Sequence, residues 1–232
     1  MKNNSIKDWP KSERPRELLL DKGPAKVSNA GLLAVILGCG TAGKDAVALA
    51  RELLKTFGGL RALFSAGYSD LKRIKGLGDA KISRILSFIE LAKRQFEEIV
   101  LAKECIESPQ DVMDYLAFSM RDLKNEFFKI LYLDQANSVL IIEDQAVGTV
   151  DHAVIYPREV IKKALDMAAS AIIFVHNHPG GNPNPSTQDL EVTRKLFAAC
   201  RAVDIKPLDH IIITPNGFHS IINRRLMQSV ET

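Results

Sequence analysis

"AIIFVHNHPGGNPNPSTQD", residues 171–189, joins an apolar run to two histidines and a loop rich in proline and glycine. Ala171–Val175 is an apolar run rich in β-branched residues, which is typical of a strand buried on both faces. His176 and His178 follow, and side chains two positions apart on a strand point the same way. Pro179 disfavours helical geometry at His178 and so extends this alternation. We therefore expect both imidazoles to face one point.

A stiff loop follows the histidines and leads into a helix. Residues 180–185 carry a glycine or proline at every one or two positions, which excludes a helix or a central strand. The next helix keeps the helical period at Leu190, Thr193, Leu196, Phe197 and Cys200. Asp189 falls in its first turn, after Ser186. Two imidazoles and one carboxylate suit zinc, and three protein ligands leave a position open for water, as in catalytic sites.

Each half of this pattern also has a purely structural interpretation. A histidine buried at a strand end usually only satisfies backbone groups. Ser186-x-x-Asp189 before an apolar run is the pattern of a capping box. The combination of HxHP, a proline-rich loop and SxxD within residues 176–189 favours a metal site over two separate structural features.

This combination resembles the JAMM (MPN-domain) metalloprotease signature, and HNHP followed by PSxxD is similar to its bacterial branch, the RadC family. The resemblance implies that zinc is bound by His176, His178 and Asp189. It also implies that Glu126 acts as the general base and that Ser186 supports the oxyanion. The implied activity is that of a zinc metallopeptidase, which cleaves an amide or isopeptide bond in a peptide or protein substrate.

Three positions limit this interpretation. Asn177 stands where JAMM enzymes outside the branch usually carry Ser or Thr, and Gly180 stands where many RadC proteins have Ser. Neither departure removes a ligand. Glu126 alone is unremarkable, because a polar residue at a strand edge is usually solvated. The RadC name also suggests an alternative, a DNA-binding or DNA-repair protein that keeps zinc for structure, although a structural site is expected to use four protein ligands.

The sequence around the histidines predicts an α/β domain. Residues 127–133 and 139–143 are apolar strands about a turn at 134–137, which predicts a hairpin. A helix over 157–168 precedes the histidine strand, and a further strand over 208–214 follows the helix that contains Asp189. This order predicts a mixed sheet flanked by helices, in agreement with the MPN fold that the resemblance implies.

The first hundred residues show helical patterns and no strand pattern before residue 124. The predicted helices span residues 16–20, 28–37, 44–57 and 79–100. We therefore predict an all-helical domain over residues 1–104 and an MPN domain over residues 105–232. The hinge is expected at residues 103–108.

Two glycine motifs lie in the helical domain. Residues 38–45, GCGTAGKD, come one residue short of a phosphate-binding P-loop. Asp45 stands where the loop needs a hydroxyl for magnesium, and the preceding residues 31–37 resemble a helix rather than a strand. We therefore expect no nucleotide.

The second motif, residues 74–82 or IKGLGDAKI, resembles a helix-hairpin-helix. Its glycines permit a tight turn, the next helix start can bind a phosphate oxygen, and Lys75 and Lys81 add charge without reading sequence. This predicts non-specific DNA binding around Lys75–Lys81. The alternative is a plain turn that packs two helices.

Charge is divided unevenly along the chain. Residues 1–107 hold 19 Lys and Arg against 13 Asp and Glu, a net charge of +6. Residues 108–232 hold 12 against 15, a net charge of −3. A basic first half is compatible with a polyanionic partner, but a solvated helical surface often carries a similar excess.

Length and composition are those of an ordinary globular protein. The 232 residues are 46% hydrophobic, enough for a sizeable core. No apolar run approaches the roughly 20 residues of a membrane span, and residues 1–8 lack the apolar stretch of a signal peptide. We therefore expect a cytoplasmic protein without a membrane partner. Cys39, Cys105 and Cys200 are odd in number and far apart, which argues against disulfides and cysteine metal sites and predicts packing roles.

Overall fold

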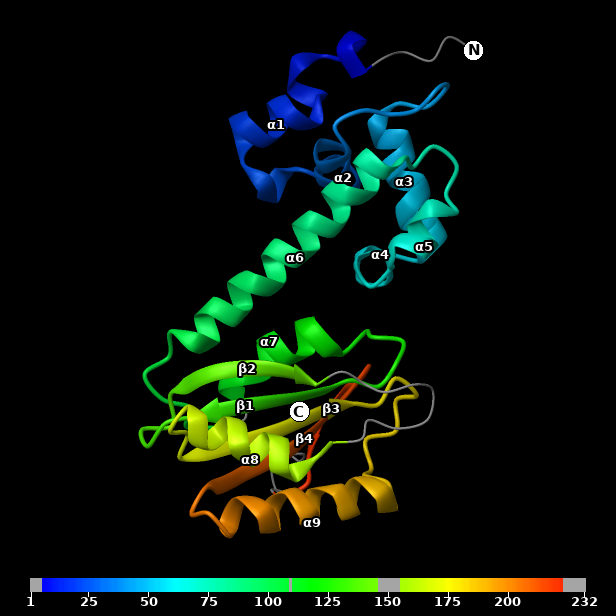
Figure 1. The fold of residues 1–232 in the computed structure, drawn as a ribbon. Coiled ribbons are helices and arrows are strands. Elements are labelled where there is room, and N and C mark those ends of the chain that lie inside the picture. The colour runs from blue at the N-terminus through cyan, green and yellow to red at the C-terminus, as the bar shows by residue number, and fades with distance from the viewer. Residues whose placement is uncertain (1–5, 109, 146–154, 223–232) are drawn as a thin grey trace, which may run out of the picture. The chain divides into compact units, whose positions relative to one another are not determined.

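The computed structural model describes residues 6–108, 110–145 and 155–222, and it divides into two compact units. The division falls between Ala92 and Lys93, inside the long helix α6 (Asp79–Leu101), whereas the sequence placed the boundary after residue 104. Each unit has its own hydrophobic core. Figure 1 shows the helices of the first unit and the sheet of the second.

The described part of the first unit is helical, as the sequence predicts. It contains the 3₁₀ turns η1 (Ile6–Asp8), η2 (Lys11–Glu13) and η3 (Pro24–Lys26), and the helices α1 (Pro15–Lys22), α2 (Asn29–Leu37), α3 (Ala46–Phe57), α4 (Leu60–Phe64), α5 (Tyr68–Lys72) and the start of α6. The two short helices α4 and α5 were not predicted. Among the described residues, no helix combines the length and the apolar character that crossing a membrane requires.

The near P-loop segment ends in a capped helix start. The Asp45 carboxylate accepts a hydrogen bond from the Ala48 N–H at 2.7 Å and so caps α3. An isolated β-bridge between Thr41 and Lys44 closes the preceding turn. The Lys44 ammonium is paired with Glu52 at 2.5 Å. The residue that departs from the P-loop pattern therefore has a structural role.

The second unit is built on a mixed sheet, which confirms the predicted fold class. Its helices are α7 (Gln110–Met120), α8 (Pro157–Asp166) and α9 (Thr187–Arg201), and its strands are β1 (Phe128–Leu133), β2 (Val139–Gln145), β3 (Ala171–Asn177), β4 (Lys206–Thr214) and β5 (Gly217–Ser220). The described strands lie in the order β2-β1-β3-β4-β5. Only the β3–β4 pair is parallel among these neighbours.

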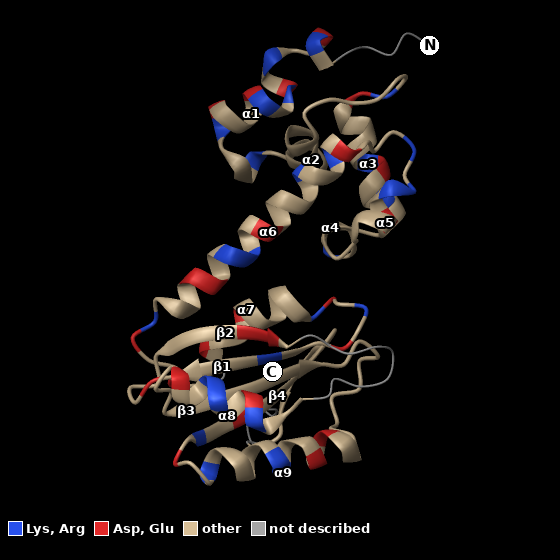
Figure 2. Cartoon of the chain, in the orientation of Figure 1, with Lys and Arg blue, Asp and Glu red and all other residues tan. Residues whose placement is uncertain are grey.

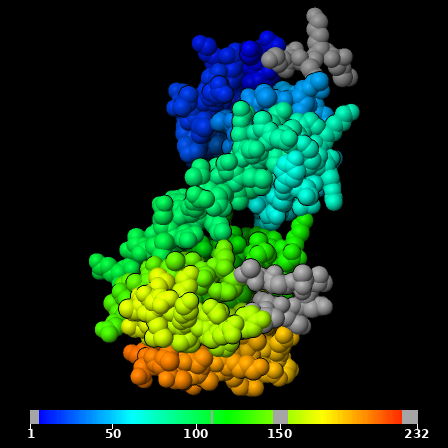
Figure 3. Space-filling view, in the orientation of Figure 1, coloured from blue at the N-terminus to red at the C-terminus, as the bar shows by residue number. Residues whose placement is uncertain are grey.

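Helices cover both faces of this sheet. Ile173 and Val175 point into a core with α7, whereas Ile172 and Phe174 point into a second core with α8 and α9. Figure 3 shows α8 and α9 side by side on one face of the unit. Because both faces are covered, all seven residues of β3 are buried, which explains its continuous apolar sequence.

Two local predictions need correction. The helix predicted over residues 157–168 ends at Asp166, and Ala168 has a left-handed φ of 52° that ends the helical geometry. The cysteines were all expected to have packing roles, but only Cys200 is buried, and Cys39 is exposed.

Candidate metal centre

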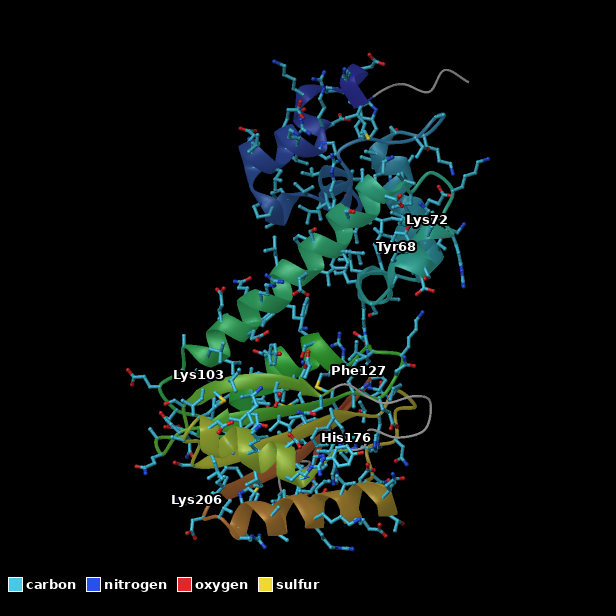
Figure 4. The ribbon with its side chains drawn as sticks, viewed as in Figure 1. Tyr68, Lys72, Lys103, Phe127, His176 and Lys206 are labelled. Atoms are coloured by element: carbon cyan, nitrogen blue, oxygen red, sulfur yellow. The ribbon has the colours of Figure 1, made fainter. Side chains whose placement is uncertain are left out.

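The three predicted metal ligands converge at one end of the sheet. His176 is the next-to-last residue of β3, His178 directly follows the strand, and Asp189 lies in the first turn of α9. Their ligand atoms all lie within 4.8 Å of one another. The two Nε2 atoms are 2.9 Å apart, and they lie 3.3 and 3.4 Å from the Asp189 carboxylate oxygens. Figure 4 labels His176 and Phe127, which lie at the same end of the sheet.

Asp189 is held in place by the start of its own helix. Its N–H donates to the Ser186 hydroxyl oxygen at 3.1 Å, and its Oδ2 accepts from both the Ser186 N–H and hydroxyl at 2.6 Å. This arrangement is the capping box that the sequence suggested. The structural and the metal-binding interpretations of SxxD are therefore compatible, because the cap fixes the carboxylate beside the histidines.

A chain of hydrogen bonds fixes the tautomer of His176. Burial lowers the pKa of His210 well below its ordinary value, so its ring is neutral. The Thr193 hydroxyl donates to the Asp189 carbonyl at 2.5 Å and therefore accepts from His210 Nδ1–H at 2.6 Å. His210 Nε2 then accepts from His176 Nδ1–H at 2.8 Å. In the neutral His176 ring, Nε2 carries the lone pair and faces the ligand cluster.

The second histidine is oriented in the same way. His178 Nδ1 lies 2.7 Å from the Asn182 carbonyl oxygen, which only accepts, so this nitrogen carries the proton. The neutral ring then presents a second lone pair at Nε2. Two nitrogen lone pairs and a carboxylate thus face one point, and three acceptors in contact need a proton or a metal ion between them.

The charge state of the cluster agrees with this requirement. Burial raises the pKa of Asp189, but its contacts with the two histidines and Ser186 outweigh burial and hold the pKa well below its ordinary range. The Asp189 carboxylate raises the pKa of His178, so a proton can occupy the cluster when no metal does. The donor set of two imidazoles and one carboxylate is one that zinc accepts.

The remaining predicted site residues line the same cleft. The cleft has a volume of about 640 Å³, and the five predicted residues on its wall are Glu126, His176, His178, Ser186 and Asp189. Glu126 is exposed and lies two residues before the start of β1, and its charge contributes to the raised pKa of His178. The fold therefore brings residues from three separate segments together.

Sequence reasoning left two contributors unassigned. His210 on β4 is one of them, and the structure places it against His176. Asp209 instead accepts from the Ser220 hydroxyl at 2.6 Å. Thr193 had been assigned to the apolar face of its helix, because its spacing gave no other signal.

Comparisons with known proteins agree with the fold. A family model described as RadC-like JAB domain matches residues 106–226, and one described as UPF0758 N-terminal matches residues 6–83. The fold and the ligand cluster therefore define a JAB-domain protein with a helical N-terminal region. UPF0758 proteins of Acidithiobacillus ferrooxidans and Stutzerimonas stutzeri are 44% and 46% identical, over 90% of this chain and 93% of each relative. That of Cellvibrio japonicus is 43% identical over 95% of this chain and 98% of the relative. The chain belongs to the UPF0758 family of RadC-like proteins.

Proposed function

We propose that the chain is a zinc-dependent hydrolase that cleaves an amide or isopeptide bond in a peptide or protein. The observation that carries this proposal is the convergence of two oriented nitrogen lone pairs and a carboxylate in a cleft that also contains Glu126. His176, His178 and Asp189 would hold the zinc ion, which would supply a Lewis acid to polarise a carbonyl group and acidify water.

The chain's own residues supply the proton transfers. The Glu126 carboxylate takes a proton from the attacking water as the water oxygen bonds to the amide carbon. As the carbon–nitrogen bond breaks, Glu126 returns that proton to the leaving amine, so the products are an acid and an amine. The Ser186 hydroxyl, which donates to Asp189 Oδ2 in this structure, turns to support the carbonyl oxygen as it gains negative charge.

The number of ligands supports catalysis over a structural role for the metal. Within the described residues the cluster offers three protein ligands. Structural zinc sites are almost always closed by four protein ligands, whereas catalytic sites keep one position for water or substrate. The cleft beside the cluster gives a substrate access to that position.

The first experiment measures metal content. Protein purified without chelator is expected to carry close to one zinc per chain, and His178→Ala and Asp189→Ala are each expected to lose it. Glu191→Ala is the matched control, because Glu191 is an exposed carboxylate on the same helix, outside the cluster. Wild-type protein without bound zinc would overturn the proposal.

The second experiment looks for turnover. Peptide and isopeptide libraries are incubated with the zinc-loaded protein, with the metal-free protein and with Asp189→Ala. The proposal expects cleavage by the zinc-loaded wild type alone. Cleavage that persists in the metal-free protein would assign the reaction to another site or to a contaminant.

For the first unit we propose non-specific DNA binding through the turn between α5 and α6. Gly76 has a φ of 94°, and a side chain there would clash with Thr41, so the turn requires glycine. Lys75 is exposed, and the Lys81 ammonium lies over the turn, 3.3 Å from the Gly76 carbonyl oxygen. Figure 2 shows basic residues gathered on this turn. Such a basic turn before a helix start suits backbone phosphates.

Salt-dependent binding to duplex DNA tests this second proposal. Lys75→Glu with Lys81→Glu is expected to weaken binding and reduce its dependence on salt, because each lost phosphate contact lowers the slope by about 1. Lys162→Glu with Lys195→Glu makes the same charge change on exposed positions of the second unit and serves as the control. Equal binding by both double variants would show that the turn only packs two helices.

A further inference from the structure

Asn177 is a buried amide that lies between two metal ligands in the sequence and points away from them. Its side chain has no exposed surface. Because residues alternate along β3, Asn177 faces the opposite side of the sheet from His176. A buried amide costs free energy unless its polar atoms are hydrogen-bonded. The partners of this amide therefore indicate its role.

These partners lie on both sides of Glu126. Asn177 Oδ1 accepts from the Phe127 N–H at 2.6 Å, and Nδ2 donates to the Asn125 carbonyl at 3.1 Å. The backbone N–H of Asn177 also donates to the Phe127 carbonyl at 3.3 Å. One side chain thus holds the peptide groups before and after Glu126.

The Asn177 side chain supplies hydrogen bonds at the point where the regular pairing of β1 with β3 ends. Regular pairing of β1 with β3 ends at Phe128 and His176. Beyond that point the backbone of His178 bonds to β4 instead, donating to the Ile213 carbonyl at 2.8 Å. Without Asn177, the segment that carries Glu126 would lose the two side-chain hydrogen bonds that tie it to β3.

The register of that segment decides which way Glu126 faces. Phe128 lies on the histidine side of the sheet, with its ring stacked parallel to His176 at 6.2 Å between centroids. Glu126, two residues earlier, shares this side when the segment stays extended. A shift of one residue would turn its carboxylate to the opposite face.

We propose that Asn177 is a positioning residue that fixes the register of residues 125–127 and so holds the Glu126 carboxylate in the cleft. The proposal rests on the proposed function for the role of Glu126. The structural part of the proposal, that Asn177 fixes residues 125–127, does not depend on the role of Glu126. A serine at this position lacks the length and the second polar group needed to hold both peptide groups.

Amide hydrogen exchange tests the structural content in the full-length protein loaded with zinc alone. Asn177→Ser is expected to speed exchange at the Phe127 amide about tenfold, the effect of losing one hydrogen bond. The β1 amides of Ile130 and Tyr132 should keep their protection, and zinc content should stay at the wild-type level. Thr214→Val, which also loses a buried hydrogen bond at the same end of the sheet, is the control and should leave Phe127 unchanged.

Two results would overturn the proposal. One is unchanged exchange at Phe127 in Asn177→Ser. The other is faster exchange along all of β1 together with loss of zinc, which would make Asn177 an ordinary core residue.

If Asn177→Ser does not fold, Asn177→Asp replaces it, because aspartate keeps the acceptor for Phe127 but loses the donor to Asn125. In that variant the Phe127 amide should stay protected, while amides earlier in the segment exchange faster. Unchanged exchange at those earlier amides would overturn the proposal.

A double-mutant cycle tests the connection to Glu126, using the library peptide that wild type cleaves fastest. Asn177→Ser is expected to lower kcat about 10²-fold, the effect of a misplaced catalytic group, with KM within roughly twofold. In the Glu126→Gln background the same change should cost nothing further. An equal loss in both backgrounds would overturn the proposal. If wild type cleaves no peptide, the hydrolase proposal fails, and the exchange experiment still decides whether Asn177 fixes the segment.

Discussion

The two units use their polar residues in opposite ways. In the first unit, Ser28 and Asp45 cap helices, and no buried side chain among the described residues is polar. In the second unit, several polar side chains are buried, and Asn177, Thr193 and His210 lie among them, next to the ligand cluster.

This difference indicates which unit carries a functional site. An apolar core stabilises a domain without the risk of an unpaired polar group, and the first unit is built that way. The polar side chains enclosed in the second unit each require partners, and a network that lost one member would cost stability. Polar groups concentrated beside one cleft are therefore better explained by a site that they orient than by stability.

The largest expected effect concerns the proposed base. Glu126→Gln should lower the rate about 10²- to 10⁴-fold, because a general base is lost, while zinc content and Tm stay at wild-type values. Rates on the best library peptide, metal analysis and thermal unfolding check this. Glu191→Gln is the control. Loss of zinc in Glu126→Gln would make Glu126 a ligand and contradict the mechanism.

The next effect concerns Ser186, which caps α9 and is the proposed oxyanion donor. Ser186→Ala should lower the rate roughly 10²- to 10³-fold, because an oxyanion donor is lost, and should also cost about 1 kcal/mol of stability, because its hydroxyl caps α9. Steady-state kinetics and denaturant unfolding measure the two effects. A stability loss without a rate loss would leave Ser186 as a cap alone.

A smaller effect concerns the hydrogen-bond chain behind His176. Thr193→Val removes the acceptor for His210 Nδ1–H and frees that ring to change tautomer. Zinc affinity should fall about 10- to 100-fold, the usual effect of losing a partner that orients a ligand. Competition with a chromophoric chelator measures the affinity. Thr214→Val should leave it unchanged, and a loss in both variants would indicate general loosening of the sheet.

Acid provides a further test of the cluster. The Asp189 carboxylate raises the pKa of His178 above its ordinary value of 6.5, and a protonated ring cannot bind metal. Apparent zinc affinity should therefore be highest above that pKa and fall about tenfold per pH unit below it. Chelator competition between pH 5.5 and 8 should find the onset of the loss above 6.5. An onset below 6.5 would contradict the assigned role of Asp189.

The smallest effect belongs to the first unit. Asp45→Ala should cost about 1 kcal/mol of stability, because it removes the cap of α3. Zinc content and peptide cleavage should not change. Unfolding monitored alongside metal analysis checks both points. A loss of zinc would show that the two units do not divide structural and chemical roles as described.

Much of the fold was predictable because it rests on local patterns. The apolar run of β3, the helical period of α9 and the long amphipathic α6 each show their type over many residues. The helices α4 and α5 span five residues each, too few for a periodic pattern to appear. They form because the surrounding chain packs on them, and no local signal encodes that packing.

The candidate site was predictable in its ligands but not in their support. His176, His178 and Asp189 lie within one short segment with recognisable spacing. Asn177 meets Phe127 across 50 positions of sequence, and His176 meets His210 across 34. Such partners are set by strand order and register, which the sequence pattern does not specify.

The double use of Asp189 also affects the proline-rich loop. A metal bound by both His178 and Asp189 would close residues 178–189 into a ring, much as a crosslink does. Because the metal binds only the closed arrangement of these ligands, it stabilises that arrangement over locally opened forms, and the loop loses local opening motions. The loop would then gain resistance to proteolytic cleavage in proportion to metal occupancy. The metal would thereby hold in place a segment that forms part of the cleft wall.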